Sequence, residues 1–169
     1  FQFLLSDDPR TKRDGENYIP TDQLYVLSPD GQPINFKKAR RFTRSEMMVM
    51  EMLSTNEWKR PMYFATTVGS DYHLGLDPYL ELTGLAYQIT PTRSADGRPR
   101  VNTERMYDNM MNKFRYGNVN KPGIYLDENT LRMCRTHRMM FYELAETLYN
   151  EGQYDKVVAV LDYAEEMLP

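Results

Sequence analysis

The fold of the C-terminal part is decided by the sequence FYELAETLYNEGQYDKVVAVLDYAEEMLP, residues 141–169. Its apolar and small residues fall at positions 141, 144, 145 and 148, and again at 157, 161 and 164. Such spacing places side chains on one face of a helix, and Gly152 lies where a left-handed residue would end the first helix. The sequence therefore predicts a helical hairpin. The residues expected at its interface are Phe141, Leu144, Ala145, Leu161 and Ala164.

This hairpin resembles a tetratricopeptide repeat, in which bulky, small and glycine positions recur at similar spacing and a proline, here Pro169, closes the unit. The resemblance implies that neighbouring repeats are needed to bury both faces of the hairpin. Because one such unit is found, and because the chain starts at Phe1 within an apolar run, we expect a piece of a longer protein.

Composition and charge narrow the classes of function. The chain has 169 residues, of which 41 % are hydrophobic, enough for one sizeable core. A net charge of −3, with charges of both signs interspersed, gives no overall field for nucleic acid or an anionic membrane. Cys134 is the single cysteine, which excludes an internal disulfide and a cysteine-built zinc site. No run approaches the roughly 20 apolar residues that cross a bilayer, so we expect a soluble chain, and nothing indicates a cofactor.

The remaining patterns predict an α+β fold, a small sheet packed with helices and followed by the hairpin. We expect an α+β domain over residues 1–120 and the hairpin region, packed on it, over 121–169. Residues 43–46, Thr-Arg-Ser-Glu, form a capping box that predicts a helix at 44–56. Runs of aromatic and β-favouring residues predict the strands. These lie at about 23–27, 62–68 and 85–90.

Three further helices and a short one are expected from capping residues. Asp77 as N-cap with Pro78 at the first helical position predicts a short helix over about 77–82. Asn102 or Thr103 would begin a helix that ends near Phe114, with Met106 and Met110 on one face. The remaining two expected helices are one of about 23 residues capped by Asp127 and one over about 154–167.

Ser70, Asp71, His73 and Asp77 lie within eight residues and are the types that a catalytic triad or a metal site uses. Known triads collect their members from separate parts of a fold, and this local set has no defined metal-ligand spacing. A surface loop with helix-capping aspartates is the interpretation that we favour. Binding by Asp71, His73 and Asp77 stays an alternative.

Tyrosines could also form a binding surface, because aromatic side chains offer large contact areas. Tyr142, Tyr149 and Tyr154 lie on the hairpin, and its exposed face is our candidate for contact with a partner. Three tyrosines also occupy core-like positions in the sequence, namely Tyr63, Tyr87 and Tyr142. Core packing is our first expectation for these three.

One basic run, residues 37–44, contains Lys37, Lys38, Arg40 and Arg41. Such a run can hold lipid headgroups, at about 1 kcal/mol for each basic residue near an anionic surface. A charged lead-in to the following helix is the interpretation that we favour, and nucleic acid is disfavoured by the acidic total.

An acidic group, Asp7, Asp8, Asp14 and Glu16, lies near the start of the chain. It does not match the alternating pattern of a calcium loop, and aspartate is favoured in turns for its hydrogen bonds to nearby backbone. We therefore expect no catalytic or metal residue there.

Six segments taken in order resemble the C-terminal region of the domain-of-unknown-function 2723 family, large polytopic membrane proteins of Bacteroidetes that are similar to protein O-mannosyltransferases. They span nearly the whole chain. The segments are SDDPRTK (6–12), YIPT (18–21), WKRPMYFA (58–65), YHLGL (72–76), LTGLAY (82–87) and RVNTERMYDN (100–109).

The resemblance implies a soluble C-terminal portion on the periplasmic face of the inner membrane. In the parent, catalytic acids would belong to a loop among N-terminal membrane helices, so no catalytic residue transfers to this chain. The parent would move sugar from a lipid-linked donor to exported proteins. Two hypotheses follow. The first is a non-catalytic module that binds an acceptor polypeptide or a protein partner through the exposed face of the hairpin and the loop at residues 69–84, or that orders the parent's membrane domain. The second is a self-contained sugar-binding or metal-dependent enzyme domain that uses residues 70–77, or Asp7 and Asp8.

Overall fold

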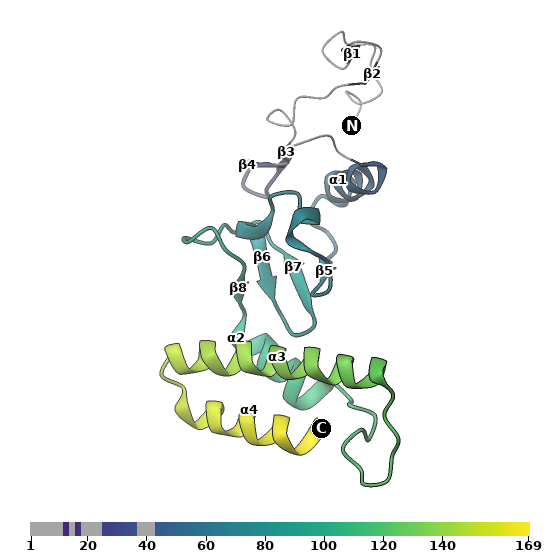
Figure 1. Cartoon of the computed structure of the whole chain (residues 1–169). Helices are drawn as coiled ribbons and strands as arrows, with labels where there is room; N and C mark the ends of the chain where they lie inside the picture. The colour runs from purple at the N-terminus through teal and green to yellow at the C-terminus, as the bar shows by residue number, and fades with distance from the viewer. Residues whose placement is uncertain (1–11, 14–15, 18–24, 37–42) are drawn as a thin grey trace. The chain divides into compact units, whose positions relative to one another are not determined.

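The computed structural model of this chain describes residues 12–13, 16–17, 25–36 and 43–169 (Figure 1). The fold is α+β, as the sequence predicts. The chain divides into two compact units, residues 1–80 with 88–99 and residues 81–87 with 100–169. The boundary expected near residue 120 stays a prediction. Among the helices that the structure describes, none combines the length and the hydropathy that a membrane crossing requires.

Among the residues that the structure describes, the strands are short and form three sheets. Two are antiparallel hairpins, and the third has four strands in the order β5-β7-β6-β8, with β6 parallel to β8. In the second hairpin the register pairs Val26 with Ile34. The hairpins are β1 (Lys12–Arg13) with β2 (Glu16–Asn17) and β3 (Tyr25–Leu27) with β4 (Pro33–Asn35), and the larger sheet contains β5 (Met62–Ala65), β6 (Leu80–Leu82), β7 (Ala86–Ile89) and β8 (Arg100–Val101).

The three predicted strands are confirmed as β3, β5 and β7, and β5 and β7 are shorter than expected. The helix predicted over 77–82 is wrong beyond its first turn. Asp77–Tyr79 forms a 3₁₀ turn, η5, whose N-cap is Leu76, and the chain then extends as β6. The reason is the alternation in β6, where Leu80 and Leu82 are buried and Glu81 between them is not. A period of two residues buries these leucines on a strand, whereas a helix would place them on different faces.

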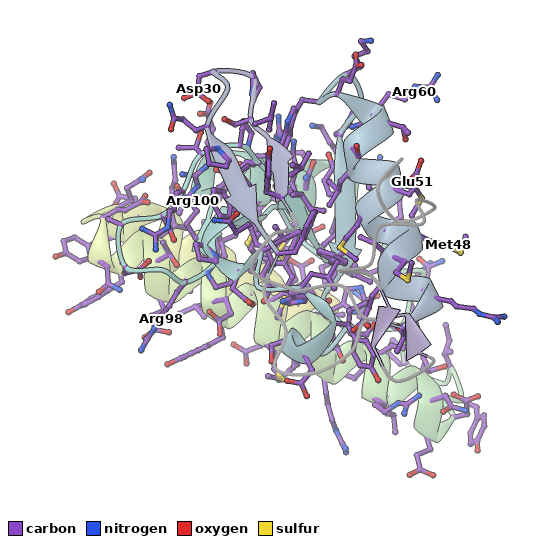
Figure 2. The ribbon with its side chains drawn as sticks, turned by 90° about the horizontal axis from the view of Figure 1, so that it is seen from above. Asp30, Met48, Glu51, Arg60, Arg98 and Arg100 are labelled. Atoms are coloured by element: carbon purple, nitrogen blue, oxygen red, sulfur yellow. The ribbon has the colours of Figure 1, made fainter. Side chains whose placement is uncertain are left out.

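In the first unit, helix α1 (Arg44–Asn56) begins at the predicted capping box. The backbone N–H of Thr43 donates to Glu46 Oε2 at 2.6 Å, and the backbone N–H of Glu46 donates to the Thr43 hydroxyl at 3.4 Å. These reciprocal bonds satisfy two N–H groups that a helix start leaves without partners. Met50 and Leu53 are buried, whereas Met48 and Glu51 lie on the outer side of α1 (Figure 2).

Replacement of Thr43 by alanine removes the capping hydroxyl. We expect the free energy of unfolding to fall by about 1 kcal/mol, because loss of an N-cap oxygen leaves an N–H group of the first turn without its partner. Thr43→Ser retains the oxygen and is the matched control, with a change of less than about half as much. Urea unfolding followed by circular dichroism measures both, and equal stability of the two variants would contradict the role of the cap.

The second unit is mostly helical, and its helix boundaries agree closely with the sequence prediction. Asn102 caps α2 through the backbone N–H of Arg105 at 2.9 Å, and Asp127 caps α3 through that of Thr130 at 2.7 Å. The helix predicted to reach Phe114 is not regular throughout, because its second half is a π-helical turn. The elements are α2 (Thr103–Tyr107), the turn η6 (Asp108–Lys113), α3 (Glu128–Asn150) and α4 (Tyr154–Met167).

Helices α3 and α4 form the predicted antiparallel hairpin (Figure 1). Gly152 has a φ of 76°, and its N–H donates to Tyr149 O at 3.0 Å while that of Gln153 donates to Leu148 O at 2.9 Å. These two bonds define a Schellman motif, which confirms the glycine cap.

The predicted hairpin interface is wrong at one residue, Leu161. Leu161 is 47 % exposed, whereas its neighbour Val160 is fully buried. Consecutive residues on a helix differ by about 100° in direction, so the packed face of α4 runs through positions 157, 160 and 164 and turns Leu161 outward. The other expected residues are buried. They are Phe141, Leu144, Ala145 and Ala164.

The hairpin core predicts a contrast between two identical substitutions. Leu144→Ala removes a fully buried side chain and should lower the stability by about 3 kcal/mol, in the usual range for buried leucine. Leu161→Ala, on the outer side of the same hairpin, should change it by less than about 0.5 kcal/mol. Thermal and urea unfolding of the purified variants give both values. Similar losses for the two variants would show that the orientation of α4 described here is incorrect.

Candidate functional site

The first candidate from the sequence, residues 70–77, folds as two 3₁₀ turns, η4 (Ser70–Tyr72) and η5. His73 is buried, its Nδ1 lies 2.9 Å from Asp77 Oδ1, and its ring lies beside that of Phe64 with centroids 5.2 Å apart. Asp71 is exposed. The carboxylate of Asp77 therefore orients a buried imidazole. Such a pair is compatible with a structural role in the core and with a catalytic role.

A metal site would need Asp71 or another ligand to join this pair. In the part of the chain that the structure describes, no three His, Cys, Asp or Glu side chains gather in a way that could hold a metal ion. Asp7 and Asp8 lie outside the described residues, as do Lys37, Lys38 and the other members of the basic run expected to contact lipid, Arg40 and Arg41.

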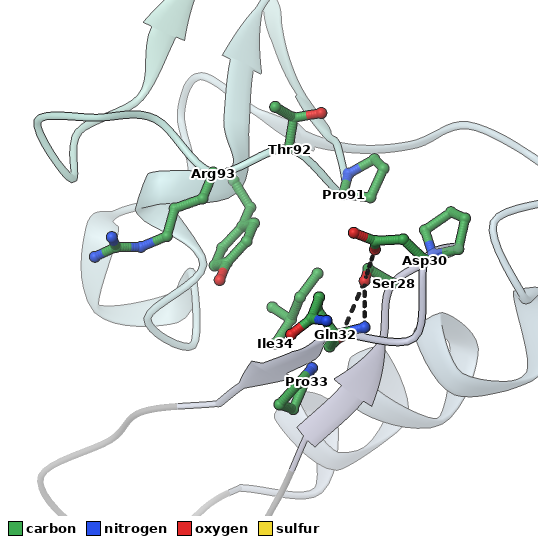
Figure 3. Close-up of a pocket in the computed structure, with 10 residues that line it drawn as sticks. Ser28, Asp30, Gln32, Pro33, Ile34, Pro91, Thr92 and Arg93 are labelled. Atoms are coloured by element: carbon green, nitrogen blue, oxygen red, sulfur yellow. Dashed lines mark hydrogen bonds between the residues drawn. The ribbon is translucent and has the colours of Figure 1, made fainter.

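A pocket of the first unit was not anticipated from the sequence (Figure 3). Its volume is about 570 Å³, which is in the range of small-molecule sites. Ile34 lies in its floor, and Asp30 and Arg93 carry its charges, with the Arg93 guanidinium directed away from Asp30. The lining comes from the β3–β4 turn, from η5 and from residues 91–93. Segments so far apart in the sequence leave no local pattern that could have revealed the pocket.

The β3–β4 turn is organised by the buried hydroxyl of Ser28. This hydroxyl donates to Asp30 Oδ1 and accepts the backbone N–H of Gln32 at 2.9 Å. The hydrogen bond from Ser28 lowers the pKa of the Asp30 carboxyl below its ordinary value, because it favours the charged form.

Ser28→Ala removes that donor, so the pKa of Asp30 should rise toward the ordinary value of about 3.9. NMR titration of the Asp30 carboxyl carbon between pH 2 and about 6 measures the shift, with Asp96 in the same variant as the internal control. In the wild type the lowered pKa stabilises the folded state above the unfolded pKa, and this contribution is lost as the pH falls through the folded value. An unchanged Asp30 titration would contradict the assignment of its cause.

The second candidate from the sequence is the outer surface of the hairpin, and here three predicted tyrosines are available to a partner. Tyr142, Tyr149 and Tyr154 are 59 % to 61 % exposed. Tyr142 and Tyr149, seven residues apart, share one face of α3. The rings of Tyr149 and Tyr154 meet edge to face with centroids 5.3 Å apart, so this contact joins the exposed surfaces of the two helices.

On α4 the exposed surface continues through Val158 and Leu161, which are four and seven residues beyond Tyr154 and share its face. We use the term outer stripe for the five residues that form this apolar surface. They are Tyr142, Tyr149, Tyr154, Val158 and Leu161.

Core packing of the other tyrosines is confirmed in part. Tyr87 packs against the core of the second unit, but Tyr63 is about half exposed and Tyr142 is mostly exposed, so the expectation for these two is wrong. A strand or helix with one solvent face can place an aromatic ring outward, which composition alone does not show. Cys134 lies buried in the helical core.

The comparison with protein families gives a match over part of the chain. Residues 30–110 match the TMEM260-associated domain 2 family. The matched segment runs from the β3–β4 turn through α1 and the four-stranded sheet into η6, and the α3–α4 hairpin lies outside it. No curated protein and no solved structure matches the chain. The match is consistent with association with a membrane protein, whereas membership of the domain-of-unknown-function 2723 family goes beyond it.

Proposed function

We propose that this chain is a non-catalytic module of a membrane glycosyltransferase-like protein of the domain-of-unknown-function 2723 type. The module lies on the periplasmic face of the inner membrane and binds a polypeptide, either the acceptor of the sugar or a partner of the parent protein. The family match at residues 30–110 supports the association with a membrane protein. The transfer of sugar from a lipid-linked donor belongs to the parent and not to this module.

The observation that carries the binding role is the outer stripe. Isolated exposed apolar side chains are ordinary, but contiguous patches on a soluble domain mark interaction surfaces. Tyrosine is also enriched at the energetic centres of protein interfaces, because it combines a large apolar ring with a hydrogen-bonding hydroxyl. The Tyr149–Tyr154 contact places two such rings side by side at the helix turn.

The alternative is a sugar-binding or metal-dependent enzyme domain that works through the His73–Asp77 pair. The hydrogen bond between His73 Nδ1 and the Asp77 carboxylate favours this alternative. Burial of His73 and the lack of a third metal ligand among the described residues weigh against it.

A selection with peptides tests the proposed role. A phage library of random 16-residue peptides is selected on the immobilised chain, and clones are then tested against the double variant Tyr149→Ala, Tyr154→Ala. We expect enriched clones to lose at least about tenfold in affinity on the variant, as for anchor residues that each contribute more than about 1 kcal/mol. The matched control is Tyr63→Ala with Tyr72→Ala, which alters exposed tyrosines of the other unit.

The same preparations decide the alternative. Metal content is measured by mass spectrometry and sugar binding on a glycan array, with His73→Ala in parallel. One equivalent of zinc or calcium that disappears in His73→Ala, or a glycan bound through the same residue, would establish the alternative. Clones that bind both tyrosine variants equally well would show that the outer stripe is not the binding surface.

A further inference from the structure

The charges around most of the outer stripe are acidic. From residue 139 to the end, the sequence contains one basic residue, Lys156. The ammonium group of Lys156 lies over the ring of Tyr107 of α2, 5.5 Å from its centroid, on the side of α4 away from Tyr154. The acidic residues in the same segment are Glu143, Glu146, Glu151, Asp155, Asp162, Glu165 and Glu166.

The helical period places several of these acids directly beside the stripe. Asp162 is four residues after Val158, and Glu165 is four residues after Leu161, so each lies on the same face as the apolar side chain one turn before it. Both acids are exposed, as is Asp155 beside Tyr154. The stripe is therefore an apolar strip with a carboxylate border on α4.

The N-terminal half of α3 carries mainly basic residues. Arg132 and Arg135 are exposed there, and Arg138 donates to the backbone O of Leu168, which ties it to the end of α4. The basic residues thus lie toward the Tyr142 end of the stripe, where Arg138 is four residues before Tyr142 and shares its face. They lie away from the Tyr149–Tyr154 end of the hairpin, so they do not offset the carboxylates there.

We infer that the outer stripe binds an amphipathic helix whose apolar side is flanked by lysine and arginine. This inference rests on the proposed function and names the chemistry of the partner. An amphipathic helix fits an apolar surface formed by two antiparallel helices, with anchors spaced at i, i+4 and i+7. Cationic flanks complement the carboxylates, which speeds encounter and sets specificity.

The same charges disfavour a second copy of this chain as the occupant. Two outer stripes in a symmetric contact centred on the Tyr149–Tyr154 end would bring the acidic borders together, because the same patch of each subunit meets in a two-fold interface. Like charges in such a contact oppose association. An acidic amphipathic helix is disfavoured for the same reason.

The test uses the 169-residue chain and two designed 18-residue helical peptides with identical leucine positions. One peptide carries lysine at the flanking positions and the other carries glutamate. Fluorescence anisotropy at 50 and 300 mM sodium chloride gives their affinities. We expect the lysine peptide to bind at least about tenfold more tightly at low salt, and its advantage to shrink at high salt because the exposed charges are screened.

Two charge-matched triple variants locate the effect. Asp155→Asn, Asp162→Asn and Glu165→Gln together should weaken binding of the lysine peptide by about fivefold or more with little change in melting temperature. The control is Glu51→Gln, Glu104→Gln and Glu128→Gln, which removes the same charge from exposed positions elsewhere and should leave the affinity nearly unchanged.

Absence of lysine-peptide binding, equal affinity for the two peptides, or equal effects of the two triple variants would overturn the inference. A dimer in analytical ultracentrifugation that excludes the lysine peptide would overturn it in favour of a second copy. The proposed function has its own readout. Tyrosine-dependent phage clones without an excess of lysine or arginine would leave the binding role standing and refute the basic partner.

Discussion

The second unit depends on the packing around one aromatic side chain, that of Phe141. Its ring centroid lies 5.9 Å from that of Tyr116 and 6.0 Å from that of Tyr163. Tyr116 in turn donates its hydroxyl to Met110 O at 2.9 Å, and its burial raises the pKa of the phenol, so it stays a neutral donor. Phe141 on α3 thereby contacts α4 directly and η6 through Tyr116. Aromatic groups of this size contribute a large share of the buried area of a small domain.

Packing on the inner side determines what the outer side can offer. Once Val160 and Ala164 face α3, the helical period turns Tyr154, Val158 and Leu161 outward. The exposed apolar surface is therefore a geometric consequence of the core. The packing does not determine the border of carboxylates. That border reflects the composition of residues 139–169, which include a single basic residue.

The parts of the fold that the sequence predicted best have local, directional signals. Thr43 with Glu46, Asp127 and Gly152 each mark a helix end through hydrogen bonds to nearby backbone, and the observed boundaries of α1, α3 and α4 follow them. Elements whose partners are distant were missed. Both β6 and β8 have two or three residues, and their pairing of Leu82 with Val101 depends on a crossover that no local pattern reveals.

The candidate sites show the same division. Exposure of Tyr149 and Tyr154 followed from spacing along two helices, whereas the orientation of Leu161 needed the true packing angle of α4. The pocket beside Asp30 joins the β3–β4 turn to residues that follow it by about fifty positions or more, so only the folded chain discloses it. The π-helical turn η6 was also unpredictable, since Met106 and Met110 keep a regular spacing of four.

The Schellman motif at Gly152 has a consequence for recognition. Its two hydrogen bonds fix the path from α3 to α4 across a handful of residues, so Tyr149 and Tyr154 meet through a turn that needs little rearrangement. A surface held in this way is preorganised. Binding to it costs less conformational entropy than binding to a flexible loop, which would have to become ordered. Gly152 has no side chain, yet by fixing this turn it contributes to the affinity with which Tyr149 and Tyr154 can bind a ligand.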